Sequence, residues 1–130
     1  MLGLINQFRA DNGVGPLSLS PTLTDAAEFH SRDMAERNYF SHDLPGIGTW
    51  SDNISNYGYP YGTRAENIAA GYSTAADTVQ SWINSPGHRA NMLNPNLTAI
   101  GIGSAYNANS QYGTYWTNTF GGTLDSQLSC

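Results

Sequence analysis

The sequence predicts an α+β domain in which helices come before strands. Three stretches in the first half of the chain carry apolar residues at spacings of three and four, as amphipathic helices do. Two stretches near the end, 97–106 and 112–120, are rich in β-branched and aromatic residues. Strand and helix patterns do not alternate, which argues against a doubly wound parallel sheet. For a chain of 130 residues we expect one domain, spanning residues 1–130.

Local sequence signals mark the end of the first predicted helix and the start of the second. The first begins near the N-terminus and stops at the turn residues 11–13, Asp-Asn-Gly. Ser20 followed by Pro21 is typical of a helix start, with serine as the N-cap and proline at the first helical position. The apolar spacing that follows predicts a second helix to about Arg37.

Two shorter helices are predicted further along the chain. A third helix over residues 50–57 has Thr49 or Ser51 as its cap and ends at a Gly-Tyr-Pro turn. A fourth helix over residues 75–85 has Thr74 as its cap. We therefore expect four helices in total.

Three segments favour extended backbone. Residues 66–72 are short and apolar between turn signals, so they fit either a strand or an extended loop. The turn-like segment 107–111 separates the two C-terminal stretches, which therefore predict a hairpin.

Composition excludes several classes of partner. The formal net charge is −5 and all five basic residues are scattered arginines, so we expect no nucleic-acid or anionic-lipid binding. No apolar run reaches the length of a membrane span, and residues 1–5 do not resemble a signal peptide.

The abundance of Asn, Ser, Thr, Gly and Tyr favours a secreted protein whose leader has been removed, and we expect a monomer. The one cysteine, Cys130, allows no internal disulfide; it could pair with a cysteine outside this chain.

Three sequence windows hold the candidate functional residues His42, Glu66 and His88. Turn-forming and small residues surround each of them, which predicts side chains presented at the surface. Separations of 24 and 22 residues mean that only the fold can bring them together. Two imidazoles and a carboxylate would form a three-ligand zinc site with an open position for water. The carboxylate could instead orient an imidazole as a general base, or the three residues could have unrelated surface roles.

Other polar residues allow weaker interpretations. His30 lies on the apolar face of the second predicted helix, so we expect a hydrogen-bonded, half-buried imidazole outside the site. Ser85 precedes a histidine by three residues, but a helix-end cap explains it better than a nucleophile does. Glu66 could pair with Asp43 or Asp77 as in a glycosidase, although the sequence does not fix their separation.

The chain resembles the CAP superfamily, named for cysteine-rich secretory proteins, antigen 5 and pathogenesis-related proteins, and in particular its bacterial-type SCP-like domains. The resemblance covers nearly the whole chain and is most specific at Glu66-Asn67-Ile68-Ala69 and Ser85-Pro86-Gly87-His88-Arg89. It implies a three-layer α-β-α sandwich with a central antiparallel sheet and an extracellular setting. It also implies a cleft with two His and two acidic residues that can bind zinc.

The resemblance carries over to this chain at three of the four cleft positions. His42 and His88 match the two histidines, and Glu66 matches the glutamate of the Glu-Asn motif. Ser85 stands where animal and plant members often have the second acid, and a hydroxyl supplies no charge. The resemblance thus implies weakened metal affinity, with His42 and His88 as ligands and Glu66 as orienter or third ligand.

Two classes of function follow from this resemblance. The first is a secreted domain whose His42, Glu66 and His88 bind zinc and, if it is an enzyme, hydrolyse a peptide or cell-wall substrate through a metal-bound water. The second is a non-catalytic module in which apolar surface near Trp50 and residues 57–61 binds a lipid, a sterol or a protein partner.

Overall fold

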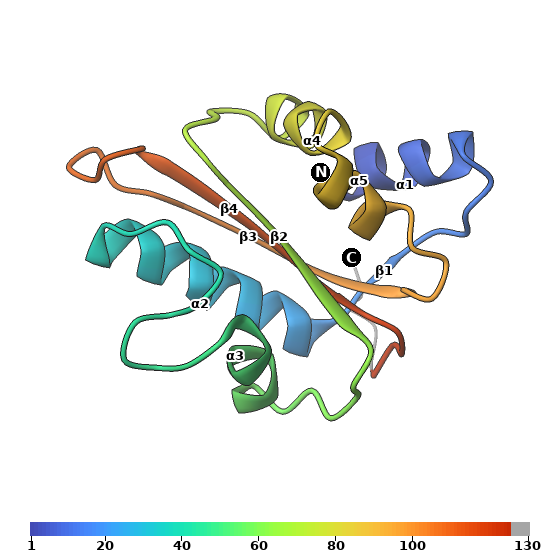
Figure 1. The fold of residues 1–130 in the computed structure, drawn as a ribbon, viewed down its shortest axis with the longest axis horizontal. Helices are drawn as coiled ribbons and strands as arrows, with labels where there is room; N and C mark the ends of the chain where they lie inside the picture. The colour runs from blue at the N-terminus through green and yellow to red at the C-terminus, as the bar shows by residue number, and fades with distance from the viewer. Residues whose placement is uncertain (126–130) are drawn as a thin grey trace.

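The computed structural model describes residues 1–125 of the chain as five helices and four strands (Figure 1). Their bounds are α1 Leu2–Asp11, β1 Ser18–Leu19, α2 Pro21–Arg37, α3 Trp50–Asn56, β2 Arg64–Ala70, α4 Ala75–Ile83, α5 Pro86–Met92, β3 Ala99–Tyr106 and β4 Thr114–Gly121. The predicted hairpin is confirmed as β3 and β4, and residues 66–72 lie mostly in strand β2.

The four strands form one sheet in the order β1-β3-β4-β2. Its centre is antiparallel: β3 pairs with β4, and β4 pairs with β2 over all seven β2 residues. The two-residue strand β1 adds to β3 in parallel, opposite Ala99 and Ile100 only. Strand β2 therefore forms one outer edge of the sheet, and most of β3 lies at the other.

Helices cover both faces of the sheet. Figure 1 shows α2 and α3 on one face and α1, α4 and α5 on the other. Apolar cores fill the space on each side, one built around Trp82 and Phe120 and another around Leu23 and Ile54. The expected α-β-α sandwich with a central antiparallel sheet is confirmed.

Local capping chemistry fixes where the helices begin. The Ser20 hydroxyl accepts a hydrogen bond from the Leu23 backbone N–H, and Pro21 follows at the first helical position. Thr49 caps α3 in a reciprocal capping box with Asp52, and Thr74 caps α4. The three predicted cap positions are thus confirmed, with Thr49 rather than Ser51 in use.

Two glycines let α2 lie directly against β3. A Cβ on Gly101 would stand 2.0 Å from the Leu23 carbonyl carbon, and one on Gly103 would stand 2.4 Å from that of Ala27. Only glycine permits this approach. The later glycine of β3 contacts the later residue of α2, so α2 and β3 run in the same direction. This packing holds the start of the loop after α2 beside the sheet.

The structure differs from the sequence prediction at two short elements. Strand β1 was not expected, and residues 86–92 form a fifth helix, α5, that was not expected either. Ser85 is the N-cap residue of α5, although its side chain makes no cap hydrogen bond. Cys130, which the sequence analysis considered for pairing with a cysteine outside this chain, lies outside the described residues. Within residues 1–125, no helix has the length and apolar character needed to span a membrane.

Candidate functional site

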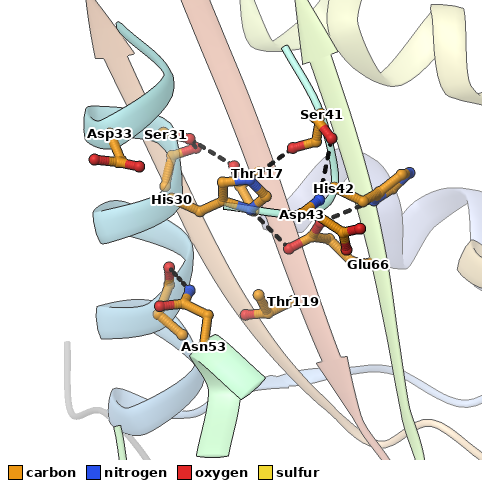
Figure 2. Close-up of polar contacts among 12 residues, drawn as sticks. His30, Ser31, Asp33, Ser41, His42, Asp43, Asn53, Glu66, Thr117 and Thr119 are labelled. Carbon is orange, nitrogen blue, oxygen red and sulfur yellow. Dashed lines mark hydrogen bonds and ion pairs between the residues drawn. The ribbon is translucent and has the colours of Figure 1, made fainter. Parts of the chain in front are cut away.

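Strand β2 and the loop after α2 bring together two of the predicted site residues. His42 lies in that loop, and its Nδ1 is 2.8 Å from Oε1 of Glu66 on β2 (Figure 2). The Glu66 residue is only 4% exposed, whereas the His42 side chain is 46% exposed. The prediction of a surface side chain is therefore wrong for Glu66, because the loop and α2 cover it.

His30 contacts the same carboxylate from the opposite side. Its Nδ1 lies 2.9 Å from Glu66 Oε2, and its Nε2 lies 2.8 Å from the backbone oxygen of Ser41. Figure 2 shows the ring reaching from α2 to both partners. His30 is hydrogen-bonded as expected, but it is completely buried and belongs to the polar cluster from which the sequence analysis excluded it.

These contacts determine where hydrogens lie in the cluster. A backbone carbonyl can only accept, so His30 Nε2 carries a hydrogen. One further proton lies between His30 Nδ1 and the carboxyl group, and the buried pair therefore has no net charge. His42 Nδ1–H donates to the other carboxyl oxygen. In neutral His42 the lone pair is consequently on Nε2, the ring nitrogen that Glu66 does not contact.

Two asparagines hold His88 next to this cluster. Asn67 on β2 donates to the His88 backbone oxygen at 3.1 Å, and Asn91 on α5 donates to the Asn67 side chain at 2.9 Å. Asn91 also donates to the backbone oxygen of Glu66 at 3.3 Å. The His88 ring packs near Trp82, with ring centroids 6.4 Å apart. The asparagines thus attach α5 to the strand that carries Glu66.

His42 and His88 line one cleft, of about 390 Å³, at the β2 edge of the sheet. We call it the histidine cleft; its lining residues are Phe40, Ser41, His42, Asp43, Ile68 and His88. A second hollow of about 280 Å³ shares Phe40, Ile68 and His88 with it and extends toward Tyr72 and Trp82. Because they share these three residues, the two hollows are adjoining parts of one groove.

The exposed imidazole of His42 and the half-buried imidazole of His88 have opposite electrostatic surroundings. The hydrogen bond to Glu66 raises the pKa of His42 above its ordinary value, and desolvation opposes this increase only in part. Desolvation lowers the pKa of His88, and the positive charge that His42 can carry lowers it further. His88 therefore has an unprotonated nitrogen at neutral pH.

The donor set of the cleft is two imidazoles and a neighbouring carboxylate. Both oxygens of Glu66 are already hydrogen-bonded to histidines, so this residue orients His42. Asp43 lines the cleft, whereas Asp77 is exposed in the first turn of α4. Ser85 lines the second hollow and supplies only a hydroxyl. Within residues 1–125, no group of three or more His, Cys, Asp and Glu side chains is arranged to hold a metal ion.

Sequence reasoning did not identify three of the residues that build this site. His30 has the spacing of an apolar helix face, so its sequence position indicates a core residue. Its partner Glu66 lies 36 positions away, so no local pattern links the two. Asn67 and Asn91 both stand inside the windows that contain Glu66 and His88. Their position beside a candidate residue was the only available signal.

Sequence comparisons identify related proteins in Bacillus subtilis. The sequence model of the CAP family, described as the cysteine-rich secretory protein family, matches residues 2–120. The uncharacterized protein YkwD is 41% identical over 117 residues, which cover 90% of this chain and 44% of YkwD. The uncharacterized membrane protein YlbC is 35% identical over 79% of this chain and 30% of YlbC. The chain thus spans less than half the length of both relatives.

Solved structures share the same fold. A Bacillus anthracis extracellular protein containing an SCP domain superposes with a TM-score of 0.83 and 35% identity, over 92% of this chain and 38% of that one. An outer surface protein from Borrelia burgdorferi gives 0.83 at 22% identity, over 92% and 87% of the two chains. The CAP domain of enterococcal PrgA gives 0.63 at 18% identity, over 99% and 62%. With the family match over nearly its whole length, this chain belongs to the CAP, or cysteine-rich secretory protein, family.

Proposed function

We propose that the histidine cleft binds a zinc ion through Nε2 of His42 and the imidazole of His88. One observation carries the proposal: Glu66 Oε1 accepts the hydrogen bond of His42 Nδ1 at 2.8 Å. Histidines that ligate metals commonly donate their second ring N–H to a carboxylate, which fixes the tautomer and strengthens the ligating nitrogen. The cluster supplies this support before any metal is present.

The residues fit an open, low-affinity site. Two imidazoles would occupy two positions of a tetrahedral zinc ion, and water or a bound ligand would fill the others. Ser85 adds no charge to the set, and the nearby Asp43 carboxylate contributes a favourable negative potential. When bound, zinc would act as a Lewis acid and lower the pKa of coordinated water.

Hydrolysis would place specific demands on this chain's residues. Glu66 has no unused oxygen, so its role would be to hold His42 in one tautomer rather than to accept the proton of a water molecule. The second hollow would position an extended peptide or cell-wall substrate next to the two imidazoles. We propose hydrolysis as a consequence of metal binding that activity assays must establish.

The proposed setting is outside the cell. The matched Bacillus anthracis structure is described as an extracellular protein, and the Borrelia structure as an outer surface protein. Fractionation of the native host tests this point: the domain should be found in the medium or the envelope. Recovery in the cytoplasm alone would contradict it.

A second candidate function rests on the second hollow of the groove rather than on the surface near Trp50 and residues 57–61, where the sequence predicted it and where Tyr59 is buried. Phe40, Ile68 and Trp82 line this hollow together with Tyr72, which is suited to a non-catalytic module that holds a lipid, a sterol or a protein segment. This function predicts binding that survives replacement of both cleft histidines. Fatty acid and sterol titrations of folded His42→Ala/His88→Ala protein distinguish it from the zinc proposal.

Calorimetric titration of zinc into metal-stripped protein tests the proposal. We expect one zinc per chain near neutral pH, no detectable binding in the double alanine variant, and about tenfold to hundredfold weaker binding in Glu66→Gln. Asp77→Asn is the matched control, because this exposed carboxylate lies outside the cleft. Zinc binding that is unchanged in the folded double variant would contradict the proposal.

A further inference from the structure

The two outer edges of the sheet differ in whether their outward backbone groups are hydrogen-bonded. At the β2 edge, the backbone oxygen of Ile68 accepts a hydrogen bond from Trp82 Nε1 at 3.0 Å, and that of Glu66 accepts one from Asn91. Side chains of α4 and α5 thus occupy carbonyl groups that another strand would otherwise use. This edge is closed to strand addition.

The opposite edge, along β3, is open beyond its first two residues. Strand β1 pairs only with Ala99 and Ile100, and the Ser20 backbone N–H donates to the Ile100 oxygen. Backbone groups alternate in direction along a strand, so those of Ile102 and Ser104 also point away from β4. Within residues 1–125, these outward N–H and C=O groups have no hydrogen-bond partner.

This edge lacks the usual protection against strand addition. Natural edge strands generally carry charges, prolines or bulges, whereas the β3 sequence AIGIGSAY contains no charged residue and no proline. A hollow of about 310 Å³ lies along the edge. Its lining residues are Glu28 and Arg32 of α2 and residues 102–105 of β3.

We propose that the β3 edge from Ile102 to Tyr106 binds an extended peptide segment of a partner protein as an added strand. Only extended backbone offers donors and acceptors at the two-residue repeat of Ile102 and Ser104. Along α2, Glu28 and Arg32 are separated by about 6 Å of helix rise. Residues two apart in a strand span about 6.6 Å. The peptide should therefore place a basic side chain beside Glu28 and an acidic one beside Arg32, two positions apart.

The packing of α2 disfavours a second copy of this chain as the occupant. Two copies joined antiparallel through β3 about a two-fold axis would place both α2 helices on the same face. Adjacent strands lie about 4.8 Å apart, but packed helices need about 8–10 Å. The glycine contacts hold α2 directly against β3, so the two helices would lie at or inside this packing distance. A lone peptide strand brings no helix.

Two synthetic peptides provide the probe. Each is a capped eight-residue peptide of alternating valine and threonine that carries Lys and Asp two positions apart, one peptide in each order. We expect one order to shift the amide NMR signals of Ile102 and Ser104 and to slow their hydrogen exchange. The other order should bind about fivefold to tenfold more weakly. Because α2 and β3 run in the same direction, preference for Lys before Asp indicates parallel addition.

Two variants make the test specific. Ser104→Pro removes an outward N–H without removing a bond to β4, and proline is tolerated at such edge positions; it should weaken both peptides about fivefold or more. The double variant Glu28→Arg/Arg32→Glu changes only exposed side chains and should reverse the preferred peptide order. If Ser104→Pro unfolds, the charge-swap variant alone decides the question.

Several results would overturn the proposal. These are signal shifts confined to the histidine cleft, equal binding of both peptide orders before and after the charge swap, or no shift at millimolar peptide. Sedimentation that reveals a dimer lost in Ser104→Pro would assign the edge to self-pairing instead. None of these results depends on zinc binding, so the two proposals fail or succeed separately.

Discussion

His30 Nδ1 lies 2.9 Å from Glu66 Oε2, and neither side chain is more than 1% exposed. The pair joins the middle of α2 to the outer strand β2. Through its second nitrogen, His30 also holds the backbone oxygen of Ser41, next to His42. One buried imidazole therefore fixes both the carboxylate and the loop of the candidate site.

Replacing His30 should destabilise the protein far more than replacing His42. His30→Ala leaves a buried carboxyl group and a backbone carbonyl without their partner, and we expect a loss of about 3–5 kcal/mol in the free energy of unfolding. His42→Ala removes a hydrogen bond to the same carboxylate. Because the His42 side chain is 46% exposed, this loss should cost about 1 kcal/mol or less. Urea unfolding of both variants measures the difference; equal losses would contradict this account.

In the metal-free protein, the pKa values of the two cleft histidines should be shifted in opposite directions, and so should their effects on stability as the pH changes. The raised pKa of His42 means that its protonation stabilises the fold; this contribution is full below about pH 6.5 and is lost as the pH rises through the higher native pKa. The lowered pKa of His88 has the reverse effect, because stability falls as the pH drops below about 6.5.

Proton NMR titration of the ring C–H signals measures both pKa values. His42 should titrate above and His88 below the ordinary histidine value. His42→Ala should raise the pKa of His88, because a neighbouring positive charge is removed. A pKa of His42 at or below the ordinary value would mean that the Glu66 hydrogen bond is absent in solution.

Adding a methyl group at the contact between α2 and β3 should be severely destabilising. Gly101→Ala would place its Cβ 2.0 Å from backbone of Leu23, which cannot yield without moving the helix, so we expect a loss of at least about 3 kcal/mol. Gly3→Ala is the control: a Cβ there meets nothing within 4 Å, and alanine should stabilise α1 by about 0.5–1 kcal/mol. Thermal and urea unfolding give both values. A tolerated Gly101→Ala would rule out such close packing.

Arg9 should be essential for the segment that follows α5. Its guanidinium is buried and donates to four backbone carbonyls, those of Gly15, Met92, Asn94 and Leu97. Arg9→Met keeps apolar volume but leaves these carbonyls without their donor, and should cost about 3 kcal/mol or more. Urea unfolding measures the loss, and Arg9→Lys should recover part of it. An unchanged midpoint in Arg9→Met would show that water replaces the guanidinium without loss.

The helix starts could be predicted because capping is local chemistry. Ser20, Thr49 and Thr74 each bond to a backbone N–H three residues ahead, within one stretch of sequence. Ser85-Pro86 repeats the Ser20-Pro21 pattern, but Gly87 favoured a turn and α5 was missed. Strand β1 was missed because two residues carry no periodicity and their pairing depends on distant Ala99 and Ile100.

The candidate site could be predicted only in part. Glu66 and His42 were recognisable as polar residues among turn-forming neighbours, but whether they would meet depended on how the loop after α2 returns to β2. His30 has the spacing of a core residue and is indeed buried; its polar partner could not be inferred because it belongs to another element of the fold.

A long-range ¹H–¹⁵N spectrum of the histidine rings tests the central claim most directly, since that claim is that Glu66 presents Nε2 of His42 to a metal ion. In metal-free protein above the pKa of His42, we predict the Nδ1–H tautomer for this residue. One equivalent of zinc should then shift Nε2 of His42 and one ring nitrogen of His88, while His30 stays unchanged. An Nε2–H tautomer of His42, or saturating zinc without a shift of either ring, would contradict the account.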